Sequence, residues 1–134
     1  MCIRDRNKRR ILFDEADRLG ITKIALGHHM DDIIETTLMN MCFHGEISTM
    51  MPVQGFFGGA LSIIRPMCQV KEQEVKRAIT LLDCPVFETT CPRKDLNRRA
   101  AIKQMVNELA RINKRVRENI FNAPDRIKSD YLPF

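Results

Sequence analysis

Apolar residues recur at the spacing of an amphipathic helix in five stretches of the chain. In such a helix, side chains three or four residues apart lie on one face, which packs against the rest of the protein. Gly20 is expected to end the first helix, because glycine readily adopts the left-handed conformation found after many helices. The predicted helices span about 7–19, 30–43, 71–82, 95–110 and 113–121. The residues expected to face inward are Ile11, Leu12, Ala16, Leu19, Ile34, Leu38, Met41, Val75, Ala78, Ile79, Leu82, Ile102, Met105, Val106 and Leu109.

Short apolar runs between the helices predict β-strands. Residues 22–26 follow a glycine stop, which is typical of a buried parallel strand, and residues 61–64 form a second run. Residues 85–88 predict a weak strand, and the glycine-rich stretch 45–59 predicts a loop with one hairpin. Strands that alternate with helices indicate an α/β fold with a parallel sheet and right-handed crossovers.

Composition is that of an ordinary globular domain. The 134 residues are 44% hydrophobic and 29% charged, and a chain of roughly this length buries about two thirds of its unfolded surface. No apolar run approaches the ~18 residues of a membrane span, and the first residues lack the apolar core of a secretion signal. We therefore expect a cytoplasmic protein with no membrane partner. Because few strands are predicted, residues 1–134 are expected to form one partial domain, the back portion of a larger one, with basic C-terminal helices over 95–122.

The five cysteines are odd in number and irregularly spaced, which argues against a secreted disulfide framework. Cys42, Cys68 and Cys84 are expected in the core, where cysteine behaves as a small apolar residue. Cys91 differs, because it precedes Pro92-Arg93-Lys94 at the start of a predicted helix. A helix N-terminus and neighbouring cations favour the thiolate, which is the form that ligates metals.

Positive charge is concentrated in the last third of the chain. Residues 1–92 contain 11 Lys or Arg against 12 Asp or Glu, whereas residues 93–134 contain 11 against 5. This excess indicates a polyanionic partner such as RNA or a nucleotide, although solvated helix faces would give the same pattern. Aromatic residues are scarce there, so such a surface would hold a nucleic-acid backbone rather than read its bases. The cations that carry this prediction are Arg93, Lys94, Arg98, Arg99 and Lys103.

The turn after the first predicted strand is the main candidate for chemistry. In open α/β sheets, ligands bind at the carboxyl ends of strands, where helix N-termini offer N–H groups and a positive dipole. Gly27 permits a close backbone approach, and His28 and His29 can donate to phosphate. Asp31 and Asp32 fall in the first helical turn, where carboxylates are suited to hold Mg²⁺.

Two other interpretations of this turn are open. Aspartates in a first turn stabilise a helix by capping it and by complementing its dipole, which contributes about 0.3–1 kcal/mol. Alternatively, His28, His29, Asp31 and Asp32 would be the ligands of a metal-dependent phosphohydrolase that holds divalent ions without ATP.

The segment Ala-Leu-Gly-His-His-Met-Asp-Asp-Ile-Ile-Glu-Thr-Thr-Leu-Met-Asn, residues 25–40, resembles the second signature of the N-type ATP pyrophosphatase (PP-loop) enzymes that modify tRNA. Such enzymes have an adenine-nucleotide α-hydrolase-like fold. Within them the chain is most similar to the tRNA 2-thiocytidine synthetase (TtcA) family, over about residues 8–109. Further residues that follow the order of that family are Gly45, Met51-Pro52, Ile64-Arg65-Pro66 and Cys91.

The resemblance implies ATP-dependent thiolation of a cytidine in tRNA, in which the base oxygen is adenylated and then displaced by sulfur held on a 4Fe-4S cluster. Three cysteines ligate the cluster in that family. Cys91 matches the late one, whereas Met1 and Arg4 stand where the other two would fall. The family's Ser-Gly-Gly-x-Asp-Ser phosphate loop does not occur in the sequence either. We therefore expect a C-terminal fragment that is inactive alone, with residues 1–6 foreign to the natural chain.

The resemblance also assigns roles to individual residues. Asp32 matches a helix aspartate beside the ATP phosphates, and Lys8 matches a basic position that faces the same site, so these are the expected catalytic residues. The expected ATP and Mg²⁺ ligands are Gly27, His28, His29 and Asp31, and the basic residues named above are expected to bind tRNA. The expected partners are tRNA, a sulfur donor such as a cysteine desulfurase, and a second copy of the chain in a homodimer.

Two further alternatives are another PP-loop tRNA enzyme and a protein without catalytic activity. The tRNA(Ile) lysidine synthetases carry a similar His-x-x-Asp-Asp helix, although Cys91 and Ile64-Arg65-Pro66 favour thiolation. A non-catalytic RNA-binding module would bind tRNA in a salt-sensitive way that does not depend on Asp32.

Overall fold

The computed structural model describes residues 3–87 and 95–133, and the side chains of 6–87 and 98–133. These residues fall into two compact units. The prediction of a single partial domain stays a prediction. The first unit comprises Met1–His28 and Met51–Gln69, and the second comprises His29–Met50 and Val70–Phe134.

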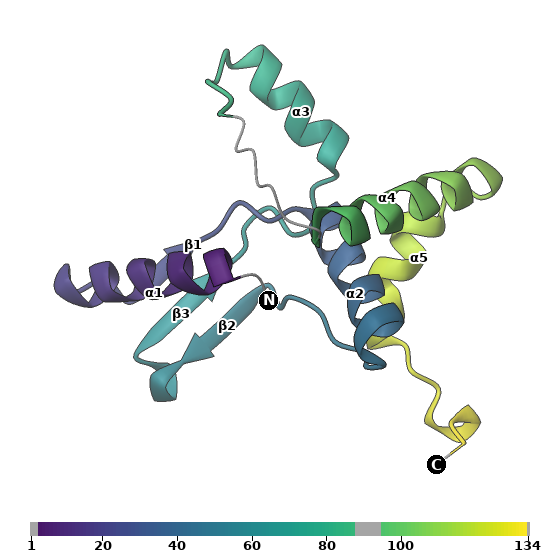
Figure 1. Cartoon of the computed structure of the whole chain (residues 1–134), viewed down its shortest axis with the longest axis horizontal. Helices are drawn as coiled ribbons and strands as arrows, with labels where there is room; N and C mark the ends of the chain where they lie inside the picture. Colours follow the sequence, from purple (N-terminus) through teal and green to yellow (C-terminus); the bar gives the residue numbers. More distant parts are fainter. Residues whose placement is uncertain (1–2, 88–94, 134) are drawn as a thin grey trace. The chain divides into compact units, whose positions relative to one another are not determined.

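The first unit contains a three-stranded sheet in the order β1 (Lys23–Ala25), β3 (Leu61–Ile64), β2 (Val53–Phe56), as Figure 1 shows. The α/β class is confirmed, and β1 runs parallel to β3 as predicted. The sheet differs from a wholly parallel one at β2, which pairs antiparallel with β3. The reason is the connection: η1 (Phe57–Gly59) joins β2 directly to β3, and a turn this short can join only antiparallel strands.

The strands differ in burial according to their place in the sheet. Leu61 and Ile63 on the central strand β3 are 6% and 2% exposed. Lys23 and Ala25 on β1 are exposed, and Ile24 is half-buried. The expectation of a buried strand was therefore wrong for β1, which lies at an edge of the described sheet.

Helix α1 (Ile3–Arg18) precedes β1 and ends where glycine was expected to end it. Gly20 has φ 66°, in the left-handed region, and the N–H of Ile21 donates to the carbonyl of Ala16 at 2.8 Å. This is the bonding pattern that closes many helix C-termini.

Only part of the predicted apolar face of α1 is covered. Ala16 is buried, but Ile11 is 65% exposed, and Leu12 and Leu19 are also exposed, so the predicted stripe is wrong at these three positions. The side chain that packs is Phe13, whose ring centroid lies 5.2 Å from that of Phe56. Phe13 lies three residues before Ala16 and so shares the covered side of the helix with it, and an aromatic pair of this kind adds to the free energy of burial.

The second unit is helical. Figure 1 shows α2 (Met30–His44) beside α4 (Asp95–Ile112) and α5 (Val116–Asn122), and α3 (Glu72–Leu81) precedes α4. Two short 3-10 helices, η2 (Ala123–Asp125) and η3 (Ser129–Tyr131), complete the described chain.

The core of the second unit lies between α2 and the two C-terminal helices. Its buried members are Met30 and Ile34 of α2 and Ile102 and Val106 of α4. The partly buried residues packed against them are Leu38, Met39, Ile120 and Phe121.

Other predicted core positions are exposed, and these predictions were wrong. Met41, Met105 and Leu109 are 47%, 36% and 41% exposed, and none of them is among the residues of this core. None of the residues of α3 is buried, and Leu82 beside it is 72% exposed. The core prediction was also wrong for Cys42 and Cys84, which are exposed, whereas Cys68 is buried as predicted.

The weak strand predicted over 85–88 is not observed in its described part, since residues 85–87 have no regular structure and residue 88 lies outside the described chain. Among the described helices, none combines the length and apolar character needed to cross a membrane.

Candidate functional site

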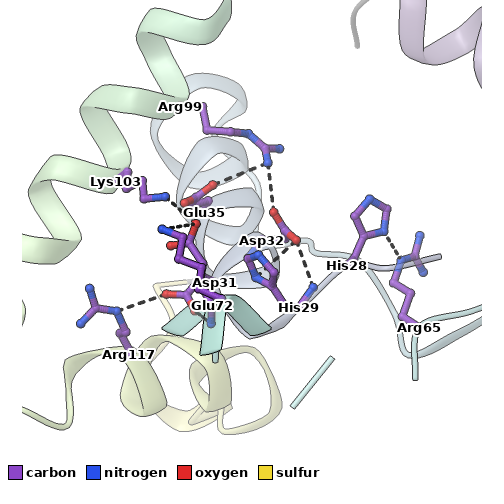
Figure 2. Close-up of polar contacts among 11 residues, drawn as sticks. His28, His29, Asp31, Asp32, Glu35, Arg65, Glu72, Arg99, Lys103 and Arg117 are labelled. Carbon is purple, nitrogen blue, oxygen red and sulfur yellow. Dashed lines mark hydrogen bonds and ion pairs between the residues drawn. The ribbon is translucent and has the colours of Figure 1, made fainter. Parts of the chain in front are cut away.

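The first turn of α2 is fixed by a reciprocal pair of hydrogen bonds between His29 and Asp32. The backbone N–H of His29 donates to Asp32 Oδ2 at 3.0 Å, and the backbone N–H of Asp32 donates to His29 Nδ1 at 3.4 Å (Figure 2). His29 is the N-cap, and together the two bonds form a capping box. The capping role considered from the sequence is therefore confirmed for Asp32.

Asp31 connects three helices through its carboxylate. Its Oδ2 accepts the backbone N–H of Glu72 at the start of α3 at 2.7 Å, and its Oδ1 accepts Nε–H of Arg117 from α5 at 3.2 Å. The side chain is only 13% exposed. Both oxygens thus have protein partners, which favours a structural role for this residue.

Arg99 of α4 places a positive charge against the acidic side of α2. Its Nη1 lies 3.5 Å from Asp32 Oδ1 and 3.5 Å from Glu35 Oε2. Burial raises the pKa of Glu35, and the charges of Arg99 and Lys103 only partly oppose this effect. About half of the Arg99 side chain remains exposed, so its guanidinium still faces solvent.

A second cation of α4 completes this arrangement. Lys103 Nζ lies 2.8 Å from Glu72 Oε1. Burial raises the pKa of Glu72, but the hydrogen bonds and charges of Lys103 and Lys76 together outweigh burial and lower that pKa. The hydrogen bond to Glu72 raises the pKa of Lys103. The two directions agree, so the pair is ionised on both sides near neutral pH.

In the second unit the structure therefore brings together five residues that the sequence singled out, namely His29, Asp31, Asp32, Arg99 and Lys103. The site residues expected from the sequence did not include their partners Glu35, Glu72 and Arg117. The spacing of Asp31 and Glu35, and of Arg99 and Lys103, was a usable signal, because residues four apart share a helix face. Nothing comparable in the sequence pointed to the start of α3 or to α5.

His28 belongs to the first unit, at the end of the segment that follows β1. Arg65, directly after β3, donates its Nε–H to His28 Nδ1 at 3.2 Å (Figure 2), and its Nη1 donates to the carbonyl of Met51. Arg65 is 4% exposed. Burial lowers the pKa of Arg65, and the charge of Arg9 lowers it further.

The remaining predicted site residues of the first unit are Gly27 and Lys8, and both are exposed. A Cβ added to Gly27 would lie 3.5 Å from Met67 Cε, an ordinary contact, so packing within the protein does not require glycine here. The catalytic role of Lys8 stays a prediction.

Three of the five predicted tRNA-binding cations have described side chains, and each of the three contacts another side chain of the protein. Arg98 Cζ lies 5.1 Å from the centroid of the Phe43 ring, a cation–π contact. Arg99 and Lys103 have the carboxylate partners described above. Arg93 and Lys94, and the predicted cluster ligand Cys91, lie outside the described residues.

The described residues hold no preformed group of side chains for a metal ion or cluster. Within them, no three His, Cys, Asp or Glu side chains come together as a metal site would require. The carboxylates of Asp31 and Asp32 are each paired with an arginine. We therefore derive no step through magnesium or an iron–sulfur cluster.

Comparison with known proteins gives consistent results. No protein-family model matches the chain. It is 34% identical over 134 residues to the tRNA-cytidine(32) 2-sulfurtransferase of Geobacter sulfurreducens, with 95% of this chain and 50% of the relative covered. It is 39% identical over 119 residues to the protein of the same name from Shewanella baltica strain OS155, with 88% and 38% covered. The chain thus spans at most about half the length of these curated relatives.

A solved structure is similar as well. The U34-tRNA thiolase NcsA from Methanococcus maripaludis, solved with its 4Fe-4S cluster, matches with a TM-score of 0.71 and 20% identity, covering 89% of this chain and 40% of that one. At this identity the match confirms the α/β fold. The sequence relatives confirm the resemblance to the tRNA 2-thiocytidine synthetase family.

Proposed function

Since the chain is a member of the tRNA-cytidine(32) 2-sulfurtransferase family by its similarity over nearly its whole length, we propose that it takes part in ATP-dependent 2-thiolation of a cytidine in tRNA. The observation that carries the proposal is the signature of residues 25–40, because its residues include the start of α2 and its capping box. The activity is that of the complete enzyme, to which this chain contributes.

The proposed chemistry has two steps. The cytidine oxygen attacks the α-phosphorus of ATP, which forms a base–adenylate and releases pyrophosphate. Sulfur then attacks the carbon of the base that bears this oxygen, and the carbon–oxygen bond breaks with release of AMP. Both steps gather negative charge on phosphate oxygens, so they require N–H donors and cations at the phosphates.

The start of α2 supplies such groups. Its helix dipole favours an anion at this end, and the capping box fixes the geometry of the first turn. Asp32 and Glu35 hold Arg99 beside that turn with its guanidinium half exposed. In the proposal, Asp32 acts by orienting Arg99, and a bound phosphate group accepts hydrogen bonds from Arg99.

For tRNA, the proposal assigns backbone contacts to the cations of α4. Arg98 is exposed on this helix, and its packing on Phe43 fixes its direction without neutralising its charge. Lys103 is 44% exposed although it pairs with Glu72. Each phosphate contact would lower the affinity at high salt, with a slope of about 0.7 to 0.9 per contact.

One observation disfavours the rival metal-dependent phosphohydrolase. A histidine that binds a metal through Nε2 donates from Nδ1 to a carbonyl or carboxylate. In His28 the polarity is reversed, because Nδ1 faces the Nε–H of Arg65, and a guanidinium can only donate. The named relatives are sulfurtransferases, which also favours thiolation over lysine transfer.

A chimera tests the proposal. In the Geobacter sulfurreducens 2-sulfurtransferase, the half that aligns with this chain is replaced by residues 7–134, and the product is expressed in a strain that lacks the enzyme. We expect 2-thiocytidine at position 32 of tRNA by mass spectrometry. The chain alone serves as the control and should give none. A folded chimera that forms no 2-thiocytidine would contradict the proposal.

A further inference from the structure

We propose that Phe43 and Arg98 together form a stacking surface for an unpaired base of an RNA, so that this part of the chain contacts a base as well as the phosphate backbone. The inference rests on the proposed function, in which tRNA is the substrate, and it adds a base contact to the phosphate contact assigned there to Arg98. Both residues belong to the second unit.

Phe43, in the last turn of α2, contacts an arginine from α4. Arg98 Cζ lies 5.1 Å from the centroid of the Phe43 ring, and Figure 1 shows α2 beside α4. Phe43 is 43% exposed, and Arg98 is exposed as well. An aromatic ring and a guanidinium are both flat groups on which nucleic-acid bases stack. The pair therefore offers solvent-facing surface that a base can cover.

The basic region does not contain this aromatic group in its own sequence. Residues 93–117 hold nine Lys or Arg against two Asp or Glu, and no aromatic residue. From the sequence we therefore expected a surface that holds the backbone without contacting bases. Phe43 lies far from this region along the chain, and the packing of α2 on α4 brings its ring to the cations. The fold thus supplies the aromatic side chain that the expected surface lacked.

The charge of Arg98 indicates which partner fits this surface. Arg99 and Lys103 pair with carboxylates, whereas within the described residues no ion pair with a carboxylate involves Arg98. A phosphate can approach Arg98 without displacing an acidic side chain. A guanidinium that packs on a ring also keeps N–H donors at its edge. RNA carries a flat base and a phosphate in each nucleotide, which favours RNA over an apolar protein surface.

Two probes of equal length separate base stacking from backbone binding. They are an oligouridylate of about eight nucleotides and the abasic ribose–phosphate chain of the same length, each titrated with the complete 134-residue chain at low salt. We expect the oligouridylate to bind at least about fivefold more tightly, because stacking on one aromatic side chain contributes about 5- to 100-fold in affinity. Equal affinity for the two probes, or no binding of either, would overturn the proposal.

Phe43→Leu tests whether this ring causes the preference. Leucine keeps an apolar side chain beside Arg98 but has no aromatic face, so the affinity for oligouridylate should fall by about fivefold or more while the abasic chain binds as before. Phe43→Tyr should retain the preference. Phe87→Leu is the matched control, since Phe87 is an exposed phenylalanine of the same unit, and it should change neither affinity. An equal loss for both probes in Phe43→Leu would overturn the base contact, because the ring would then only orient Arg98.

Arg98→Lys tests the guanidinium at an exposed position, where substitutions rarely disturb folding. Lysine keeps the charge but lacks the flat group, so the salt dependence should persist while the preference for oligouridylate decreases. Arg98→Gln should instead lower the salt slope by about 0.7, the value for one phosphate contact of a single strand. An unchanged preference in Arg98→Lys would overturn the stacking role of Arg98. A chimera that forms no 2-thiocytidine would count against the proposed function and leave these binding results intact.

Discussion

Asp31 and Asp32 are neighbours in the sequence, yet their carboxylates contact different partners. Asp31 joins α2 to the start of α3 and to α5 through Glu72 and Arg117. Asp32 closes the capping box and faces Arg99. Because consecutive residues of a helix point about 100° apart, adjacent aspartates necessarily meet different neighbours. We accordingly assign stability to the first and chemistry to the second.

Asp31→Ala should lower the free energy of unfolding by about 1–3 kcal/mol, because it leaves the Arg117 guanidinium and the Glu72 N–H without their acceptor. Asp17→Ala is the matched control, since Asp17 is an exposed aspartate of α1, and should change stability by less than about 0.5 kcal/mol. Urea titration of the chain followed by circular dichroism measures both. Equal effects of the two substitutions would remove the structural role of Asp31.

Glu35→Gln should change the pH dependence of stability. The pKa of Glu35 in the folded chain is raised above its ordinary 4.5, so the folded state binds the proton more tightly than the unfolded state. The stability of the natural chain therefore falls, relative to Glu35→Gln, as pH rises from about 4 to 7. Urea titrations at both pH values test this sign. A relative gain for the natural chain over that interval would mean that Arg99 outweighs burial.

At the scale of single residues, the sequence predicted the groups that gather at α2 better than it predicted their contacts. His29, Asp32 and Arg99 were all singled out, and the capping role was considered. Glu35 was not among the expected site residues, because its helical spacing from Asp31 shows that the two share a face but does not show that Glu35 is buried. Arg65 was noted only as part of the resemblance, since its contact with His28 joins segments 37 residues apart.

At the scale of elements, the attachment of α4 to α2 holds Arg99 and Lys103 in place. Ile102 and Val106 of α4 are each 4% exposed and pack against Met30 and Ile34 of α2. These residues lie on the side of α4 that also carries Lys103 and Arg99 to the carboxylates. Packing therefore orients the charges.

Ile102→Ala should lower the free energy of unfolding by about 2–5 kcal/mol, the usual cost of a cavity in a core. Met105→Ala, on the same helix but 36% exposed, should cost clearly less and is the matched control. Thermal or urea unfolding monitored by circular dichroism compares the two. Similar costs at both positions would show that α4 packs through a different face.

The helices were predictable from periodicity because amphipathic spacing is a local property. Their bounds agree within a few residues for α2 and α3, while α5 begins at Val116 and not at 113. Which apolar face is covered is a tertiary property, and the spacing cannot reveal it. Helix α3 illustrates this, because it has the expected amphipathic pattern and yet none of its residues is buried.

At the scale of the whole molecule, the resemblance carries more functional information than the composition does. The excess of positive charge after residue 92 indicated only a polyanionic partner. The two units contain the parallel β1–β3 pair and the following helix α2 that the signature implied. The antiparallel strand β2 was not predicted as such, because strand direction depends on the connection and not on the apolar run itself.

The central claim is that Asp32 serves ATP-dependent thiolation as well as capping, and one substitution in the chimera tests it most directly. Asp32→Asn keeps an oxygen that can accept the His29 N–H but removes the charge that orients Arg99. We predict that kcat/KM for ATP falls by about 10- to 100-fold with little change in melting temperature, whereas Asp17→Asn leaves both unchanged. Unchanged thiolation by the Asp32→Asn chimera would contradict the account.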